Sequence, residues 1–325
     1  MATTVISDPK LFGYWAYQAI EKHFHKTIKH ESDVLKDKDP EALHQMRVGM
    51  RRLRTAVTGF EKALVLPKAA REKKIAKVAR KLGKLRDLDV LQDALKNHYL
   101  PPLPIDEQKA LKKVLATLKK QRQHSLEVVR TTLEEEGYQE LKQGLKDWLE
   151  KPTYGAFAEL AIQDILPDLL LPLVSQLCLH PAWLVGAKLQ TGEIDVNGDL
   201  SGESLVKLLS HRAEELHDLR KQAKRVRYQM ELFTEFYDSN YHDFITQIKS
   251  LQRILGNIQD SFVLSEFLAD SLNVEIAVEL PTLTEHLQAD RYQSWQEWRQ
   301  LQQQYLNPQT KKDFHYAVLQ PINTN

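Results

Sequence analysis

Cysteine, glycine and proline are scarce in this chain. Its 325 residues include one Cys, Cys178, with 12 Gly and 13 Pro. A lone Cys cannot form an internal disulfide or a Cys-based zinc site, so the composition favours a reducing compartment and predicts a cytoplasmic protein. The β-branched alternation typical of strands is also scarce, whereas helix-forming Leu, Ala, Gln, Glu, Lys and Arg are plentiful. The sequence therefore predicts an all-α fold.

Long apolar runs and a leader sequence are also lacking. The N-terminus has no basic start followed by an apolar stretch, so we expect no signal peptide. The longest uncharged stretch, residues 169–187, contains two prolines together with Ser175, Gln176 and His180. It suits a buried helix better than a membrane span, and we expect no membrane partner.

The charge is nearly balanced overall but lopsided along the chain. The formal net charge is +1. Residues 44–86, however, hold fourteen Lys and Arg against two acids, Glu61 and Glu72, a local net charge of +12. Because whole-chain charge says nothing about its distribution, a polyanion partner stays possible.

Helix start and stop signals divide the chain. Asp39 and Pro40 begin a helix, the pattern ends near Pro67, and a second helix runs to about Asn97. Charged helices follow from Asp106 to Pro152. A later loop is marked by Gly192, Asn197, Gly198 and Gly202. A long helix follows, beginning near Ser201 and breaking at residues 238–240, and another helix then runs to about Leu272.

Two motifs repeat at one spacing. HQMRVGMRRLR, from His44, aligns with HDLRKQAKRVR, from His217; LGKLRDLDVL, from Leu82, aligns with LGNIQDSFVL, from Leu255. Both alignments use an offset of 173 residues and need no gap. The shared offset indicates duplication of a helix hairpin and predicts two pseudo-symmetric helical bundles.

The repeated helix carries cations on one side. His44, Arg47, Arg51 and Arg54 fall within a sector of about 80°. The apolar residues of this helix, on a roughly opposite sector, are Met46, Met50, Leu53, Val57 and Phe60. In the second copy the cationic set is His217, Arg220, Lys224 and Arg227, and the apolar set is Leu219, Ala223, Val226, Met230 and Phe233.

The next helix adds a second cationic row. If the chain reverses near Leu66, Lys81 lies beside Arg51 in an antiparallel hairpin. Lys81 shares one side of its helix with Lys74, Lys77 and Lys84. Adjoining like charges repel by tenths of a kcal/mol per close pair, so we expect an anion to compensate them. We call His44, Arg47, Arg51 and Arg54 with these four lysines the first basic face, and the second cationic set the second basic face.

Multivalent phosphate binding suits such faces. Arg donates a planar pair of hydrogen bonds to phosphate oxygens, Lys supplies a flexible charge, and cations spaced by one turn, roughly 5 Å, meet several units of a phosphate chain. Protonated His44 and His217 would donate too, which predicts tighter binding at mildly acidic pH. The competing interpretations are an ordinary solvated helix exterior for the faces and a structural role for either histidine.

Other residue types argue for structural roles. Gly83 and Gly256 are expected to allow close helix approach, and Asp87 and Asp260 to orient a nearby Arg or cap a turn. We expect no metal site or cofactor, since His23 and His25 point about 200° apart on a helix. Except for Tyr228, aromatic residues lie outside the basic faces, which weakens a nucleic-acid interpretation.

The quoted motifs, with HQMRVGMRRLRTAVTGF and LHDLRKQAKRVRYQMELF, resemble the CHAD family, the conserved histidine α-helical domain. The resemblance implies a domain over residues 1–306, with helical repeats at about 8–152 and 156–306 around a basic central cavity, a C-terminal tail at 307–325, and polyphosphate binding, possibly at polyphosphate granules. It places on one side of the cavity His44, Arg47, Arg51, Arg52, Arg54, Lys81 and Lys84. It places on the other side His217, Arg220, Lys221, Lys224, Arg225 and Arg227. The first-face geometry adds Lys74 and Lys77, and the repeat adds the matched pair Arg80 and Arg253.

The second copy departs from the first. Ile254, Asn257 and Gln259 stand at the positions of Lys81, Lys84 and Arg86, so the two halves are expected to contribute unequally. The alternating Glu-x-Glu-x-Lys signature of the triphosphatase domain found in some family members is absent. We therefore expect binding without catalysis. The alternatives are an enzyme of polyphosphate metabolism, which would need carboxylate-held Mg²⁺ or a nucleophile, and a nucleic-acid-binding or scaffold protein.

Overall fold

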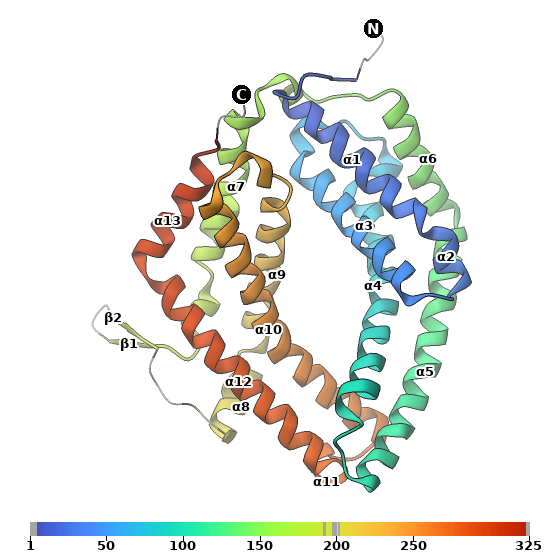
Figure 1. Ribbon diagram of the computed structural model, residues 1–325, viewed down its shortest axis with the longest axis vertical. Helices are drawn as coiled ribbons and strands as arrows, with labels where there is room; N and C mark the ends of the chain where they lie inside the picture. The colour runs from blue at the N-terminus through green and yellow to red at the C-terminus, as the bar shows by residue number, and fades with distance from the viewer. Residues whose placement is uncertain (1–4, 191–192, 197–199, 201, 323–325) are drawn as a thin grey trace. The chain divides into compact units, whose positions relative to one another are not determined.

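Two helical units, each with its own core, make up the chain in the computed structural model (Figure 1). The structure describes residues 5–190, 193–196, 200 and 202–322. Unit 1 comprises Met1–Pro102 and Leu111–Ile165, and unit 2 comprises Leu103–Ala110 and Leu166–Asn325. The expected all-α fold is confirmed; among the described residues only β1 (Lys188–Gln190) and β2 (Glu193–Asp195) form a sheet, an antiparallel pair.

Unit 1 is built around a pair of long helices, α3 and α4, which pack against each other and against α1 and α6. Its helices are α1 (Phe12–Lys29), α2 (Glu31–Lys36), α3 (Pro40–Gly59), α4 (Glu72–Asp93), most of α5 (Ile105–Glu134) and α6 (Glu136–Glu150). A π-helical turn, Ala94–Tyr99, continues α4.

Unit 2 repeats the arrangement of a helix pair, here α9 and α10, with α12 packed on α10. Its elements include most of α7 (Ile162–Cys178), α8 (Gly202–His211), α9 (Ala213–Met230), α10 (Ser239–Leu272), α11 (Ile276–Glu279), α12 (Pro281–Leu306) and α13 (Pro308–Leu319). The segment set apart above as a tail thus contains α13, whose Phe314 is fully buried and stacks on Phe244 with ring centroids 4.3 Å apart.

The start signals read from the sequence are confirmed. Asp39 caps α3, its carboxylate accepting the backbone N–H of Glu41 at 2.8 Å, and Pro40 takes the first helical position, where its missing N–H costs nothing. Asp238 caps α10 in the same way by accepting from the Tyr241 N–H.

One expected helix is divided. The segment expected to run unbroken from Ser201 to residue 238 forms α8 and α9, which meet at Arg212. Neither Gly nor Pro marks this break, and nothing in the structure explains it. Ser201 and the loop markers Gly192, Asn197 and Gly198 lie outside the described residues.

Both expected apolar sectors form the cores. Met46, Met50, Leu53, Val57 and Phe60 are each 6% exposed or less. Their counterparts in the second copy, Leu219, Ala223, Val226, Met230 and Phe233, are also buried. Because each helix buries this sector, its cationic sector is directed away from the core.

A buried carboxylate organises the start of α12. Glu107, in the first turn of α5, is 6% exposed and accepts the backbone N–H groups of Thr282 and Leu283, both at 3.1 Å. These N–H groups lie in the first turn of α12 and have no partner within the helix, and a negative charge is favourable at a helix N-terminus. Residues 103–110 therefore belong to unit 2, although the rest of α5 packs in unit 1.

Residues 162–184, which include α7, are long and apolar enough to span a membrane by length and composition. A core helix passes the same test. Pro167 and Pro172 lie within α7, and the buried side chains Leu170, Val174 and Leu177 recur at helical spacing. The expected buried role agrees with this one-sided burial.

His23 of α1 is buried beside cations, and burial, followed by the charges of Arg52, Lys22 and Lys26, lowers its pKa to about 4. Its Nδ1 has no hydrogen-bond partner among the described residues. The neutral ring is therefore the form that the fold accommodates.

We predict that this histidine makes unit 1 sensitive to acid. Between its ordinary pKa near 6.5 and the folded-state value, the unfolded chain binds a proton that the folded chain does not, so stability falls as pH drops through this window. The loss should reach about 2–3 kcal/mol. Urea unfolding at pH 7 and pH 4.5 should show a smaller loss for His23→Leu than for the wild type, whereas exposed His25→Gln should match the wild type.

Candidate functional site

The first basic face lies along the antiparallel pair α3 and α4 (Figure 1). The chain reverses between Phe60 and Arg71, in agreement with the expected reversal near Leu66. Arg47 lies across Gly83 of α4, where a Cβ built on Gly83 would be 3.8 Å from Arg47 Nε. Gly83 precedes Lys84, which is the residue that the expected register, with Lys81 beside Arg51, places next to Arg47. The helix register that the face requires is thereby supported at Arg47.

The α4 cations are poorly neutralised. Within the described chain, no ion pair is formed by Lys74, Lys77, Arg80, Lys81 or Lys84. Two carboxylates reach the α3 cations: Glu72 accepts from Arg54 Nε at 2.6 Å, and Asp87 lies 3.8 Å from Arg47 Nη2. Most of the row on α4 thus faces solvent without a counter-charge.

His44 sits among these cations, partly buried. Burial lowers its pKa below the ordinary value; Glu41 opposes this shift, and Arg86, Arg47 and Arg51 reinforce it. In the unliganded protein the ring is consequently neutral at pH 7, and a bound anion would have to supply the free energy that protonates it.

The second basic face repeats one contact of the first. Arg220 lies across Gly256 of α10, and Nη1 of Arg220 approaches the Asp260 carboxylate at 3.3 Å. All three residues stand 173 positions after Arg47, Gly83 and Asp87. Of the two roles expected for Asp87 and Asp260, orienting a nearby Arg or capping a turn, these contacts agree with the first. The nearest atoms to a Cβ built on either glycine belong to the arginine and not to a packed helix, and only at Gly256 is the contact tight, at 3.0 Å from Arg220 Nη2.

Gln259 organises the second face, a role that the sequence does not predict, because an amide at the position of Arg86 indicates only a lost charge. Its Oε1 accepts from Arg220 Nη1 at 2.9 Å and meets His217 Nδ1 at 2.5 Å. Since Arg only donates, the oxygen is the acceptor in both contacts, so His217 Nδ1 carries the proton. The Nε2 atom of His217 is then the ring nitrogen left for a ligand.

The second face holds less uncompensated charge than the first. Of its members, Arg220 lies 3.3 Å from Asp260 and Arg227 pairs with Glu231 at 3.3 Å, and the neighbouring Lys221 pairs with Asp218 at 2.8 Å. Asp218 also bonds to His180, and the hydrogen bonds from Lys221 and His180 lower its pKa. Lys224 is partly buried and Arg225 is exposed.

Three expected site residues lie apart from the faces or are already engaged. Arg52 is exposed on α3, and its charge acts on buried His23 of α1. Arg253 pairs with Glu297 of α12. Its counterpart Arg80 is exposed on α4.

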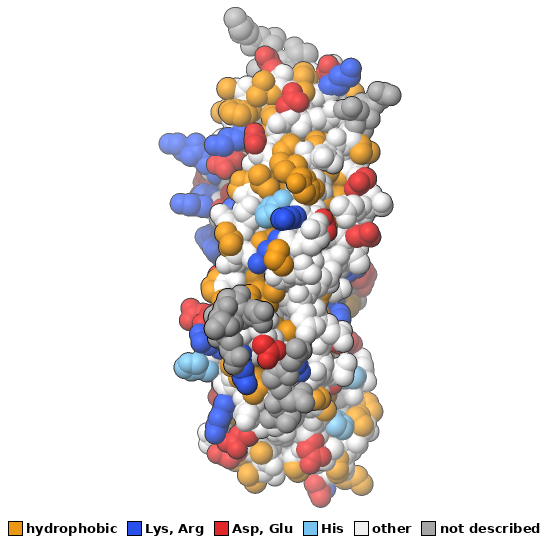
Figure 2. All heavy atoms as spheres, turned by 90° about the vertical axis from the view of Figure 1, so that its left-hand side faces the viewer, with side chains coloured by type: hydrophobic (Ala, Val, Ile, Leu, Met, Phe, Trp, Pro, Cys, Tyr) orange, Lys and Arg blue, Asp and Glu red, His pale blue; other side chains and the backbone are white. Residues whose placement is uncertain are grey.

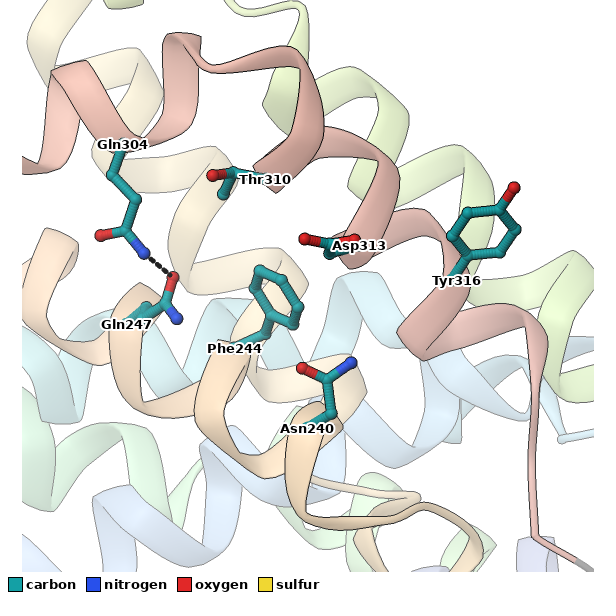
Figure 3. A pocket seen from close by; sticks show the side chains of 7 residues that line it. All are labelled: Asn240, Phe244, Gln247, Gln304, Thr310, Asp313 and Tyr316. Carbon is teal, nitrogen blue, oxygen red and sulfur yellow. Dashed lines mark hydrogen bonds between the residues drawn. The ribbon is translucent and has the colours of Figure 1, made fainter.

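A cavity of about 290 Å³ in unit 2 is chemically unlike the basic faces (Figure 3). It lies between α10, α12 and α13, with Gln304 donating to Gln247 at its edge. Its lining includes the Asp313 carboxylate and no Lys, Arg or His. The side of unit 2 that carries α12 and α13 mixes acidic, basic and apolar side chains, as expected of a solvated surface (Figure 2).

The fold and the two repeated His- and Arg-bearing helix pairs define an all-α protein with a duplicated basic motif. The family model for the CHAD domain matches residues 18–269, and the chain belongs to this family. No curated protein matches it.

Solved structures share the fold. The CHAD domain from the plant Ricinus communis aligns with a TM-score of 0.59 at 21% identity, covering 98% of this chain and 96% of that one. PptA from Streptomyces chartreusis aligns with a TM-score of 0.61 at 15% identity, covering 89% of this chain and 98% of that one.

The two glycines under the guanidinium groups form a matched pair for substitution. Gly83→Ala adds a Cβ at ordinary contact distance and should stabilise unit 1 by about 0.5–1 kcal/mol through helix propensity. A Cβ on Gly256 would lie 3.0 Å from Arg220 Nη2, so in Gly256→Ala the guanidinium must shift by a few tenths of an ångström, which weakens its contacts with Gln259 and Asp260. We expect urea unfolding to place Gly256→Ala about 1–2 kcal/mol below Gly83→Ala. Equal stabilisation of both variants would contradict this account of the contact.

Proposed function

We propose that this protein binds inorganic polyphosphate without turning it over, chiefly through the first basic face, with the second basic face contributing less. The observation that carries the proposal is the row of α4 cations, which form no ion pair with any residue that the structure describes. This row lies beside the partly buried His44, Arg47 and Arg51 of α3. An extended polyanion is the ligand that compensates such a row, because it offers charges at a repeating spacing.

The arrangement of the arginines also suits phosphate. Arg47 lies over Gly83 with its Nη2 atom 3.8 Å from the Asp87 carboxylate, which favours one orientation of the guanidinium before a ligand arrives. Arg220 is held more firmly, by Gly256, Gln259 and Asp260. Prepositioned donors lose less conformational entropy on binding, which favours affinity.

A binding role fits the faces better than phosphoryl transfer. Of the carboxylates at the first face, Glu72 and Asp87 each approach an Arg. A Mg²⁺-dependent enzyme would instead need carboxylates free to hold the metal. Nucleic acid is a weaker candidate, because aromatic side chains for base stacking are missing from the first basic face. Cytoplasmic residence, including at polyphosphate granules, is part of the proposal.

Charge reversal on α4 tests the proposal. Lys77→Glu/Lys84→Glu changes two exposed lysines seven residues apart on α4, and Lys112→Glu/Lys119→Glu makes the same change at the same spacing on exposed positions of α5. We expect the α4 variant to lose at least about tenfold in affinity for long-chain polyphosphate and to flatten the slope of log affinity against log salt by about 1–2. The α5 variant should stay near the wild type.

Equal losses in both double variants would mean that binding follows net charge and not the first basic face. Phosphate release should be followed in the same titrations with Mg²⁺ present, since steady release would contradict the non-catalytic part of the proposal. Single-stranded and duplex DNA serve as competitors; either one displacing polyphosphate at equal charge concentration would favour a nucleic-acid partner.

The histidine of the first face predicts how binding depends on pH. The pKa of His44 lies below its ordinary value in the free protein, and a bound polyanion should raise it. Affinity should therefore rise as pH falls through the pKa of the complex and level off below the pKa of the free protein. Titrations from pH 8 to pH 5.5 should show a shallower rise for His44→Gln than for the wild type. If the two profiles coincide, His44 does not contact the ligand as a cation.

A further inference from the structure

A buried cation of α12 lies outside both basic faces. Arg291 of α12 is 6% exposed. Its Nε donates to Ser261 Oγ at 2.8 Å and its Nη2 to Ser265 Oγ at 2.9 Å, while its guanidinium carbon lies 4.4 Å from the centroid of the Phe262 ring. All three partners belong to α10, so one side of the guanidinium is held by a single helix.

No counter-charge accompanies this guanidinium. Across the described residues, no Asp or Glu forms an ion pair with Arg291, and burial alone lowers its pKa. An Arg remains protonated in proteins, and a buried charge without an opposite charge is costly. The charge is thus stabilised only by hydroxyl dipoles and the face of one aromatic ring.

Unit 1 contains a useful contrast. Arg122 of α5 binds both oxygens of Asp37 at 2.7 Å and Asp89 of α4 at 2.7 Å. The repeat offset of 173 places Phe262 at the position of Asp89. In unit 1 a carboxylate at this position, Asp89, neutralises Arg122. In unit 2 the equivalent position holds the Phe262 ring, which contacts Arg291 without neutralising it.

The serines leave part of the guanidinium available. Ser261 and Ser265 donate their own protons to the backbone carbonyls of Ile258, at 2.9 Å, and Ser261, at 2.8 Å, so their oxygens can only accept from Arg291. The Nη1 atom of Arg291 makes no hydrogen bond to a described residue, and it is not fully excluded from solvent. The edge formed by Nη1 and Nη2 matches two oxygens of a single anion.

We propose that Arg291, braced by Ser261 and Ser265, binds a compact oxyanion at the Nη1–Nη2 edge of its guanidinium. The shared chemistry is two coplanar oxygens carrying negative charge, as in a phosphoryl or a carboxylate group. The site is independent of the proposed polyphosphate binding, since it uses no residue of either basic face.

The Nε–Hε NMR signal of Arg291 reports on this site directly, because Ser261 shields that proton from exchange. The full-length ¹⁵N-labelled protein is titrated with sodium phosphate, and in a second series with sodium acetate, replacing NaCl at constant pH and ionic strength. We expect a saturable shift of the Arg291 signal in at least the phosphate series. The Arg122 signal is the internal control and should not shift, because Asp37 and Asp89 occupy that guanidinium.

Two variants test the site. Arg291→Gln assigns the NMR signal by removing it. Ser265→Ala removes one hydrogen bond to the guanidinium and keeps the charge, and it should weaken the affinity for the anion about threefold or more. Saturation with phosphate alone identifies a phosphoryl site, and saturation with both anions identifies a general oxyanion site. No saturation in either series overturns the proposal. The same titration with Lys77→Glu/Lys84→Glu should be unchanged, so failure of polyphosphate binding and failure of this site are distinguishable.

Discussion

Burial of the apolar sector of α3 is the interaction that keeps the first basic face assembled. Like charges on neighbouring helix positions repel by tenths of a kcal/mol per pair. Each Leu- or Met-sized side chain buried on the opposite sector contributes about 1.5–3 kcal/mol. Met46, Met50 and Leu53 are each at most 1% exposed. The free energy gained by burying these side chains outweighs the repulsion and prevents the helix from rotating to separate its cations. The protein thus holds a strained charge distribution before any ligand is present.

The same logic accounts for the arginine that crosses a glycine in each unit. The close approach of Arg220 to α10 requires a position without a side chain, because a Cβ on Gly256 would lie 3.0 Å from the guanidinium, whereas a Cβ on Gly83 would meet Arg47 only at ordinary contact distance. The recurrence of Arg, Gly and Asp at one offset agrees with the duplication inferred from the motifs. The two faces differ in charge: Gln259 and nearby acids hold the second face in place, while the lysines of the first face on α4 form no ion pair with any described residue.

Features that depend on local periodicity were predictable from sequence. The Asp39 cap, the buried sector of α3 and the orienting role of Asp87 follow from spacing within one or two helices. Features that depend on tertiary neighbours were not. Arg51 and Arg52 are adjacent arginines that the sequence pattern alone does not separate into different roles. The charge of Arg52 acts on His23 of α1, which only the packed structure reveals. The bond between Gln259 and His217 joins residues on two helices, and an amide gives no sequence signal for that role. No Gly or Pro in the sequence marks the break between α8 and α9 at Arg212.

Glu107 has a consequence for where this protein can be cut. The repeat boundary near residue 154 looks like a natural site of division, but the carboxylate that completes the start of α12 is encoded almost fifty residues earlier, at the beginning of a helix whose remainder packs elsewhere. A fragment made of the C-terminal half alone would expose two amide groups and the apolar surface around them. The boundary of unit 2 therefore does not coincide with the boundary between the sequence repeats, and the C-terminal unit depends on the first turn of α5, which precedes it in the chain.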